Sequence, residues 1–486
     1  MSAGIAITIL IAYFCVLMVI GYFTSKDSND TTFYNADRSA PWYLVAFGMV
    51  GVSLSGVTFI SVPGEVGNTH WSYLTLVMGN CIGYILIACI LLPIFYKLNL
   101  ISIYGWLEKR YGLKTKKSGS ILFLISQLIG ASFRLFLIVS VLQIAFFDSV
   151  GIPTWCTVLI TLLFVWLYTF KGGIKTLVWT DTLQTIFMLL SLFITIYVIC
   201  KELNFSVDQI IPNIAQSDYS SIFDWDWKSG QNTIKQLIAG ISITIAINGL
   251  DQNMMQKNLT CSSLKDCKKN MFTFSGFFLI TNILFLIMGS LLYIYANSKG
   301  VEIPAKSDQL FPTLALNHFG FFAGICFLLG VTAAAYSSVD SSLTAMTTAF
   351  CSDIIGITKE NPRPKTRVIV HLLFSLLMGA IIIVFNATNN SSVVSAVFTA
   401  VGYTYGPILG LFLFGLCTKR TINEKFVPYI CIASPIISWI INRYSETILF
   451  GYKFGFEILL LNALISIIGL ALISSPTCPE NNSKLR

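Results

Sequence analysis

Apolar segments of about twenty residues recur from one end of the sequence to the other, and they restrict the possible folds more than any other feature. Backbone N–H and C=O groups in hydrocarbon must find partners within the protein, so segments of this kind cross a bilayer as helices. The composition agrees, because 55% of the residues are hydrophobic, 11% are charged and the mean hydropathy is +0.75. We therefore predict an all-α polytopic membrane protein.

The apolar segments also predict the topology. We place thirteen membrane-spanning helices at 4–24, 42–69, 72–96, 119–146, 153–170, 177–200, 233–250, 271–296, 321–352, 368–388, 392–416, 426–442 and 454–473. With the N-terminus outside, 23 of the 31 Lys and Arg residues fall in cytoplasmic segments, including Lys257 after the seventh helix. By the positive-inside rule, this asymmetry predicts an outer N-terminus and a cytoplasmic C-terminus.

The segment 331–353, VTAAAYSSVDSSLTAMTTAFCSD, is as long as a membrane span but carries a carboxylate and many hydroxyls. On a helix, five of its residues fall within roughly half of the circumference: Ala334, Ser337, Ser338, Asp340 and Ser341. An ionisable side chain at membrane depth costs roughly 3 kcal/mol, so Asp340 should face protein, water or an ion. The hydroxyls alone would also suit a small-residue helix interface. Asp340 favours an ion site.

The second predicted helix contains residues that interrupt a plain membrane span. Within GMVGVSLSGVTFISVPGEVG, small and hydroxyl residues recur at spacings of three and four, and Gly56, Pro63 and Gly64 weaken the helix. We predict a local unwinding, where freed carbonyls can bind a cation. Close packing through the glycines is the alternative.

Two further charges lie within predicted membrane segments. Arg134 is too deep for easy snorkelling and needs an acceptor. Asp181 lies near the inner end of the sixth predicted helix, where a helix-start or interface role is the alternative to ion binding. In this prediction, Asp181 and Asp340 are the acidic residues within the membrane interior. Arg134 then either binds a substrate or forms a permanent ion pair with Asp340.

The sequence contains no recognisable enzyme motif. The three histidines lie far apart without an HExxH spacing, and there is no Walker motif, so we predict no catalytic residues and no cofactor. The basic residues are spread over many short loops, which does not favour nucleic-acid binding. Uphill movement of a solute would then depend on an ion gradient.

Five stretches together resemble the sodium/solute symporter family, which includes sodium-coupled carriers of glucose, proline, iodide and sialic acid. They are LSGVTFISVPG, GGIKTLVWTDTLQT, GLDQNMMQKNL, AAAYSSVDSS and YGPILGLFLFG. The resemblance implies the fold first seen in a sodium/leucine carrier, with two inverted five-helix repeats. These would be residues 42–200 and 233–418, separated by an outer loop at 201–232. Residues 1–41 and 419–486 would add three peripheral helices and the cytoplasmic tail.

The same resemblance implies the residues that bind sodium. The principal sodium site would use Gly51, Leu54, Ala334, Ser337 and Ser338. A second sodium site, found in carriers similar to those for sialic acid, would use Asp181, Ser337 and Ser341. Asp340 departs from that pattern, since those carriers have a hydroxyl there, and it would either strengthen the second site or hold a proton.

The resemblance is closest to bacterial sialic acid carriers in the residues expected to bind substrate. Arg134 matches an arginine that binds the substrate carboxylate, and nearby polar contacts match Ser53, Ser55 and Thr58. Val77 departs from the pattern, because it stands about where the sugar carriers place a polar contact.

These observations predict a bacterial inner-membrane symporter that imports a small organic solute together with Na⁺ by alternating access, acting as a monomer in the lipid bilayer. The solute would carry a carboxylate, as sialic acids and other sugar acids do. A neutral sugar or an amino acid is the alternative solute. Proteins of another class that would fit are a sodium or solute sensor and a channel, although the sequence has no TVGYG-type filter.

Overall fold

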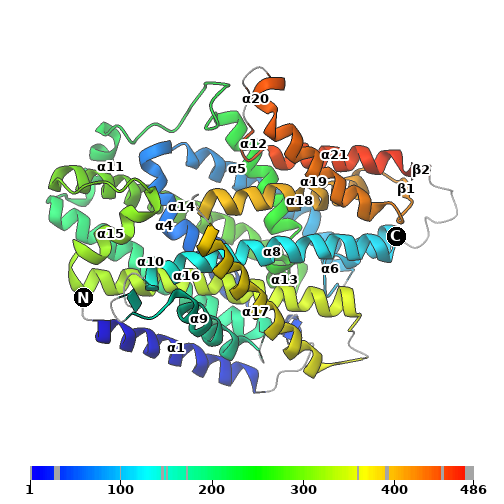
Figure 1. Cartoon of the computed structure of the whole chain (residues 1–486), viewed down its shortest axis with the longest axis horizontal. Coiled ribbons are helices and arrows are strands. Elements are labelled where there is room, and N and C mark those ends of the chain that lie inside the picture. The colour runs from blue at the N-terminus through cyan, green and yellow to red at the C-terminus, as the bar shows by residue number, and fades with distance from the viewer. Residues whose placement is uncertain are drawn as a thin grey trace.

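The computed structural model describes residues 3–26, 33–34, 36–98, 100–143, 147–148, 151–170, 173–357, 361–388, 393–449, 452 and 454–476. Nearly all of this part is helical, and the long helices lie side by side along the longest axis of the molecule (Figure 1). A short antiparallel pair joins β1 (Thr421–Ile422) to β2 (Ser474–Ser475). The predicted tail beyond residue 476 lies outside the described residues.

The first half of the chain contains α1 (Ala3–Ser25), α3 (Trp42–Ser53), α4 (Gly56–Thr69), α5 (Tyr73–Leu86), α6 (Leu92–Lys97), α7 (Gly105–Tyr111), α8 (Leu113–Leu142), α9 (Thr154–Thr169), α10 (Gly173–Leu203) and α11 (Val207–Gln216). The second half contains α12 (Thr233–Thr244), α13 (Gln252–Asn258), α14 (Leu264–Lys299), α15 (Leu310–Asn317), α16 (Gly320–Ala349), α17 (Pro364–Thr388), α18 (Val393–Cys417), α19 (Val427–Arg443), α20 (Ser445–Ile448) and α21 (Ile458–Leu472). Three π-helical turns continue α5, α12 and α16, namely η2 (Ile87–Leu91), η5 (Ile245–Gly249) and η7 (Phe350–Ile355). Two 3₁₀ turns are η1 (Ala36–Arg38) and η6 (Ser307–Gln309).

The prediction of a polytopic helical membrane protein is confirmed. Within the described residues, eight helices are long and apolar enough to cross a membrane, or up to ten if each of two bent pairs is one span. Three shorter apolar helices, α9, α19 and α21, overlap the predicted segments 153–170, 426–442 and 454–473. The total of thirteen spans stays a prediction.

Two helices are broken, and each continues in a new direction after the break. The axis turns by 58° between α3 and α4, where the sequence predicts an unwinding, and by 71° between η5 and α13, where it predicts only a helix end at residue 250. At the second break, the Asp251 carboxylate accepts hydrogen bonds from the backbone N–H groups of Asn253 and Met254, so it caps the start of α13. The polar residues after Leu250 therefore form α13, the second part of a broken helix. The predicted helix end at residue 250 agrees with the end of η5 at Gly249, but α13 was not predicted.

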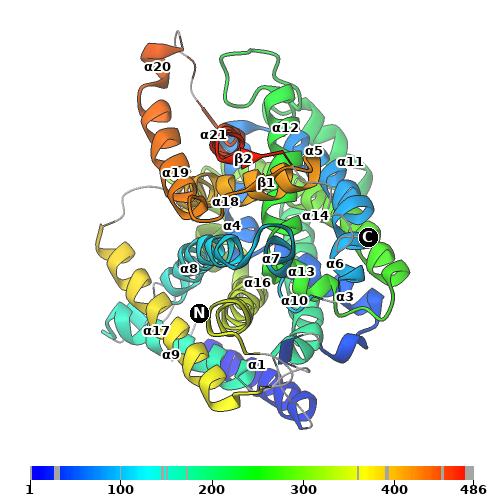
Figure 2. The ribbon, with the colours of Figure 1, turned by 90° about the vertical axis from the view of Figure 1, so that its right-hand side faces the viewer.

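Helix α16 forms the centre of the bundle, and Figure 2 shows it surrounded by other helices. Every residue from 330 to 349 is buried. Small residues allow this close packing: Gly330 faces Ser191 of α10, and Gly56 of α4 faces Ala335. The carboxylate-bearing segment singled out by its sequence is therefore shielded by protein on all sides.

Two groups of helices lie on opposite flanks of the bundle. Helices α1, α9 and α17 lie together on one flank, while α19, α20 and α21 lie on the opposite one (Figures 1 and 2). The predicted outer loop at 201–232 contains a short helix, α11, because Ser206 and Gln209 form a capping box at its start.

Candidate functional site

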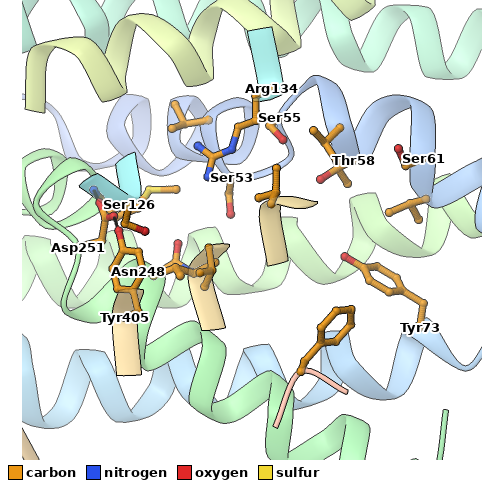
Figure 3. A pocket seen from close by; sticks show the side chains of 18 of the residues that line it. Ser53, Ser55, Thr58, Ser61, Tyr73, Ser126, Arg134, Asn248, Asp251 and Tyr405 are labelled. Carbon is orange, nitrogen blue, oxygen red and sulfur yellow. Dashed lines mark hydrogen bonds between the residues drawn. The ribbon is translucent and has the colours of Figure 1, made fainter. Parts of the chain in front are cut away.

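A cavity of about 380 Å³ lies beside both broken helices. Figure 3 shows that its polar side chains come from α4, α5, α8, η5 and α18 as well as from the two breaks. Those labelled there are Ser53, Ser55, Thr58, Ser61, Tyr73, Ser126, Arg134, Asn248, Asp251 and Tyr405. The four residues predicted to bind substrate are all among them. Val77 is fully buried and is not part of the lining, whereas Tyr73, one turn earlier, is.

Arg134 extends from α8 into this cavity (Figure 3). Its Nη1 donates a hydrogen bond to the Ser338 hydroxyl, 3.1 Å away. Among the described residues, no carboxylate oxygen lies within 4.0 Å of its guanidinium. The predicted alternative of a permanent ion pair with Asp340 is therefore wrong.

Asp251 is a buried acidic residue that was not among the predicted site residues. It is 1% exposed, lines the same cavity as Arg134, and accepts hydrogen bonds from the Gln127 amide and the Tyr405 hydroxyl. Backbone N–H groups of α13 supply two more donors. The signal was available, since an aspartate directly before a short helix-forming run is a typical N-cap. Asp181 and Asp340 are thus not the only buried acids within the membrane segments.

The five residues predicted for the principal sodium site form what we call the neutral cluster: Gly51, Leu54, Ala334, Ser337 and Ser338. Their elements are in contact, because a Cβ atom added to Gly56, just after the break, would lie 3.0 Å from the Ala335 Cβ. The cluster therefore combines one helix end with one face of α16. In this structure, the hydroxyl of Ser337 donates to Asp181 Oδ1 at 2.7 Å and that of Ser338 accepts from Arg134.

The residues predicted for the second sodium site surround a lysine. Lys257 of α13 donates hydrogen bonds from its ammonium group to Asp181 Oδ2 and to the Ser341 hydroxyl, the latter at 2.6 Å. Lys257 and Asp181 are each 1% exposed. The prediction that Lys257 lies in a cytoplasmic loop is therefore wrong. Together with Asp340, these residues form what we call the charged cluster: Asp181, Lys257, Asp340 and Ser341.

Asp340 occupies the far side of the charged cluster. Its Oδ2 accepts a hydrogen bond from the Tyr168 hydroxyl at 2.7 Å, and its Oδ1 accepts one from Ser341 at 3.1 Å. Tyr168 belongs to α9 and was not among the predicted site residues. Asp181 and Asp340 thus each accept a hydrogen bond from a donor on another helix, Lys257 and Tyr168 respectively.

The comparisons with known proteins agree with this arrangement. Residues 33–425 match the model of the sodium:solute symporter family. The sodium/sialic acid symporter SiaT of Proteus mirabilis (strain HI4320) is 25% identical over 91% of this chain and 90% of its own length. The sodium/sialic acid symporter NanT of Aliivibrio fischeri (strain ATCC 700601 / ES114) is 24% identical over 89% and 86%, respectively.

Among solved structures, a substrate-bound, outward-open Na⁺-coupled sialic acid symporter has the same fold. It superposes with a TM-score of 0.83 at 21% identity and covers 96% of this chain and 97% of its own. Its description records a novel Na⁺ site. The family match covers most of the chain and fits the helical bundle and its polar central cavity. This multi-pass membrane protein belongs to the sodium:solute symporter family and is a sodium-coupled symporter.

Proposed function

We propose that this symporter imports a small solute bearing a carboxylate, such as a sialic acid or another sugar acid. The observation that carries the proposal is the Arg134 guanidinium, which faces the cavity with no carboxylate partner among the described residues. A guanidinium in a partly desolvated site is well shaped to pair with a carboxylate through two parallel hydrogen bonds. A carboxylate in the cavity would supply the acceptor that a deep arginine needs.

The rest of the cavity suits a hydroxylated solute. Its lining alternates hydroxyl and amide groups, including Ser61, Tyr73 and Asn248, with apolar side chains. Asp251 already accepts hydrogen bonds from two side chains and two backbone N–H groups, so much of its hydrogen-bonding capacity is used within the protein. The names of two relatives, both sodium/sialic acid symporters, support a sugar acid.

We further propose that the transported sodium ion binds at the neutral cluster. Carbonyls freed at the break after Ser53 and hydroxyls of α16 would supply the several oxygen ligands that a small hard cation needs. Rearrangement of Ser337 and Ser338 away from Asp181 and Arg134 would accompany ion binding. Sodium would thereby be linked to the arginine that contacts the solute.

The proposed transport cycle is alternating access between two inverted repeats, residues 42–200 and 233–418. Each repeat begins with a broken helix, α3–α4 or α12–α13, and both breaks lie beside the cavity. We propose thirteen spans, an outer N-terminus and a cytoplasmic C-terminus in a bacterial inner membrane. Because one chain contains the whole cavity, a monomer would suffice for transport.

Uptake into proteoliposomes under an imposed sodium gradient tests this function. We expect labelled sialic acid to accumulate, and unlabelled sugar acids to compete better than neutral sugars or amino acids. Arg134→Lys should raise the KM for the solute at least about tenfold, because the charge remains but the paired geometry is lost. Arg110→Lys is the control, since Arg110 lies on α7 and donates to main-chain carbonyls outside the cavity.

Three results would contradict the proposal. Equal competition by neutral sugars would favour the alternative of a neutral solute. An unchanged KM in Arg134→Lys would remove the carboxylate contact. Steady uncoupled current through the protein would instead indicate a channel.

A further inference from the structure

We propose that Lys257 is a built-in cation that takes the place of a second sodium ion, so that the protein binds a single Na⁺ per transport cycle. The ammonium lies between the Asp181 carboxylate and the Ser341 hydroxyl, two of the three groups expected around a second sodium ion. The third, Ser337, donates to the other oxygen of the same carboxylate. The site is therefore complete without a diffusible ion.

At Asp181, the charge balance favours one cation. A carboxylate that is 1% exposed is costly unless a positive charge pairs with it, and Lys257 supplies that charge through a direct hydrogen bond. A sodium ion in contact with the same carboxylate would lie within a few ångströms of the ammonium and repel it. The ammonium and the ion would thus compete for Asp181 and Ser341.

The fold explains how a lysine reaches this position. The 71° bend before α13 directs this short helix inward, and all seven of its residues are buried. The apolar stem of Lys257 is packed in the protein interior while its ammonium group reaches the polar face between α10 and α16. Unlike a sodium ion, this cation is covalently attached and cannot leave with the solute.

The consequence for coupling is specific. One sodium ion would bind, at the neutral cluster, and none at the charged cluster. If the solute is a monoanion, which rests on the function proposed above, one Na⁺ and one solute together carry no net charge across the membrane. A symporter with a second sodium ion would carry one positive charge per cycle.

The number of bound ions can be counted without any solute. Each sodium ion that binds only the folded protein raises the folded-to-unfolded ratio about tenfold for each tenfold rise in Na⁺ above its Kd. For the purified wild-type protein, we expect the folded-to-unfolded ratio to rise tenfold for each tenfold rise in Na⁺. The total ionic strength is kept constant with N-methyl-D-glucamine chloride. In Lys257→Met, which has a side chain of similar length without the charge, we expect a rise approaching a hundredfold, because the freed carboxylate can bind a second ion.

Two control variants separate this proposal from a structural role. Lys257→Arg keeps a cation beside Asp181 and should retain the tenfold response. The double variant Lys257→Met with Asp181→Asn lacks both charges and should also show a tenfold response, because no carboxylate remains to attract a second ion. If Lys257→Met does not fold, the sodium responses of the wild type and the double variant still test the proposal.

A hundredfold response in the wild type would overturn the proposal, because two ions would then bind with Lys257 in place. A tenfold response in a folded Lys257→Met protein would also overturn it. Because these measurements contain no solute, their failure is distinct from failure of the carboxylate-solute proposal. That proposal fails if uptake does not prefer acids, whatever the sodium count.

Discussion

The neutral cluster and the charged cluster share α16, which contributes Ala334, Ser337 and Ser338 to the first and Asp340 and Ser341 to the second. They nevertheless use opposite means to place a positive charge beside this helix. The neutral cluster offers only carbonyl and hydroxyl oxygens, so any cation that binds there can leave again. The charged cluster has two carboxylates, and one of them is bound by a lysine of the same chain. A cation bound by neutral ligands can therefore exchange, whereas a lysine bound to a buried carboxylate stays in place.

The variant with the largest expected effect tests whether Asp181 and Lys257 form a permanent ion pair. Asp181→Ala would leave the Lys257 ammonium buried without its carboxylate, which typically costs 3–5 kcal/mol of stability. The double variant Asp181→Asn with Lys257→Met should recover most of that loss. Unfolding midpoints of the detergent-purified proteins measure both changes. If the double variant is no more stable than Asp181→Ala, the pair is not what stabilises this region.

A variant with a smaller expected effect tests whether the neutral cluster depends on close contact between α4 and α16. Gly56→Val should separate α4 from α16, since even a Cβ would lie 3.0 Å from that of Ala335, and overpacking of this kind costs about 1–3 kcal/mol. We expect the half-saturating sodium concentration for uptake to rise. Gly276→Val is the control, because a Cβ there has no neighbouring atom within 4 Å. Equal sodium dependence in the two variants would argue against a site at this break.

The smallest expected effect is that of removing one hydroxyl group, the one on Ser338. Ser338→Ala should raise the half-saturating sodium concentration about tenfold, which corresponds to about 1.4 kcal/mol for one lost ligand. Ser132→Ala is a suitable control, because that hydroxyl is buried nearby on α8 but donates only to the Leu128 carbonyl of its own helix. A shift of equal size in both variants would show that loss of any buried hydroxyl has this effect. The neutral cluster would then lose its assigned role.

Much of the fold could be predicted because hydrocarbon offers the backbone no hydrogen-bond partners, so few backbone structures are stable there. Apolar segments of sufficient length become helices, and glycines around Ser55 predict the break that the structure places there. The helix that contains Asp340 could be identified because a carboxylate in such a segment needs a buried environment. The four residues expected to contact substrate do line one cavity.

The errors that concern the residues after Leu250 share one cause. The residues after Leu250 are polar and include a lysine, so hydropathy and the positive-inside rule both assign them to a cytoplasmic loop. In the structure they form a buried half-helix, capped by Asp251. Hydropathy measures the composition of a local segment. It does not report which polar groups on distant helices are available to pair with it.

Three properties could therefore be predicted from the sequence: the helical membrane bundle, the helix interrupted by glycines, and the polar face of α16. These properties follow from local composition and periodicity in a solvent that cannot hydrogen-bond. The sequence did not reveal that Asp181 pairs with Lys257, 76 residues away, or that Arg134 contacts Ser338 and not Asp340. The energy of a buried charge depends on the partner within a few ångströms, and that partner is chosen by how the helices pack.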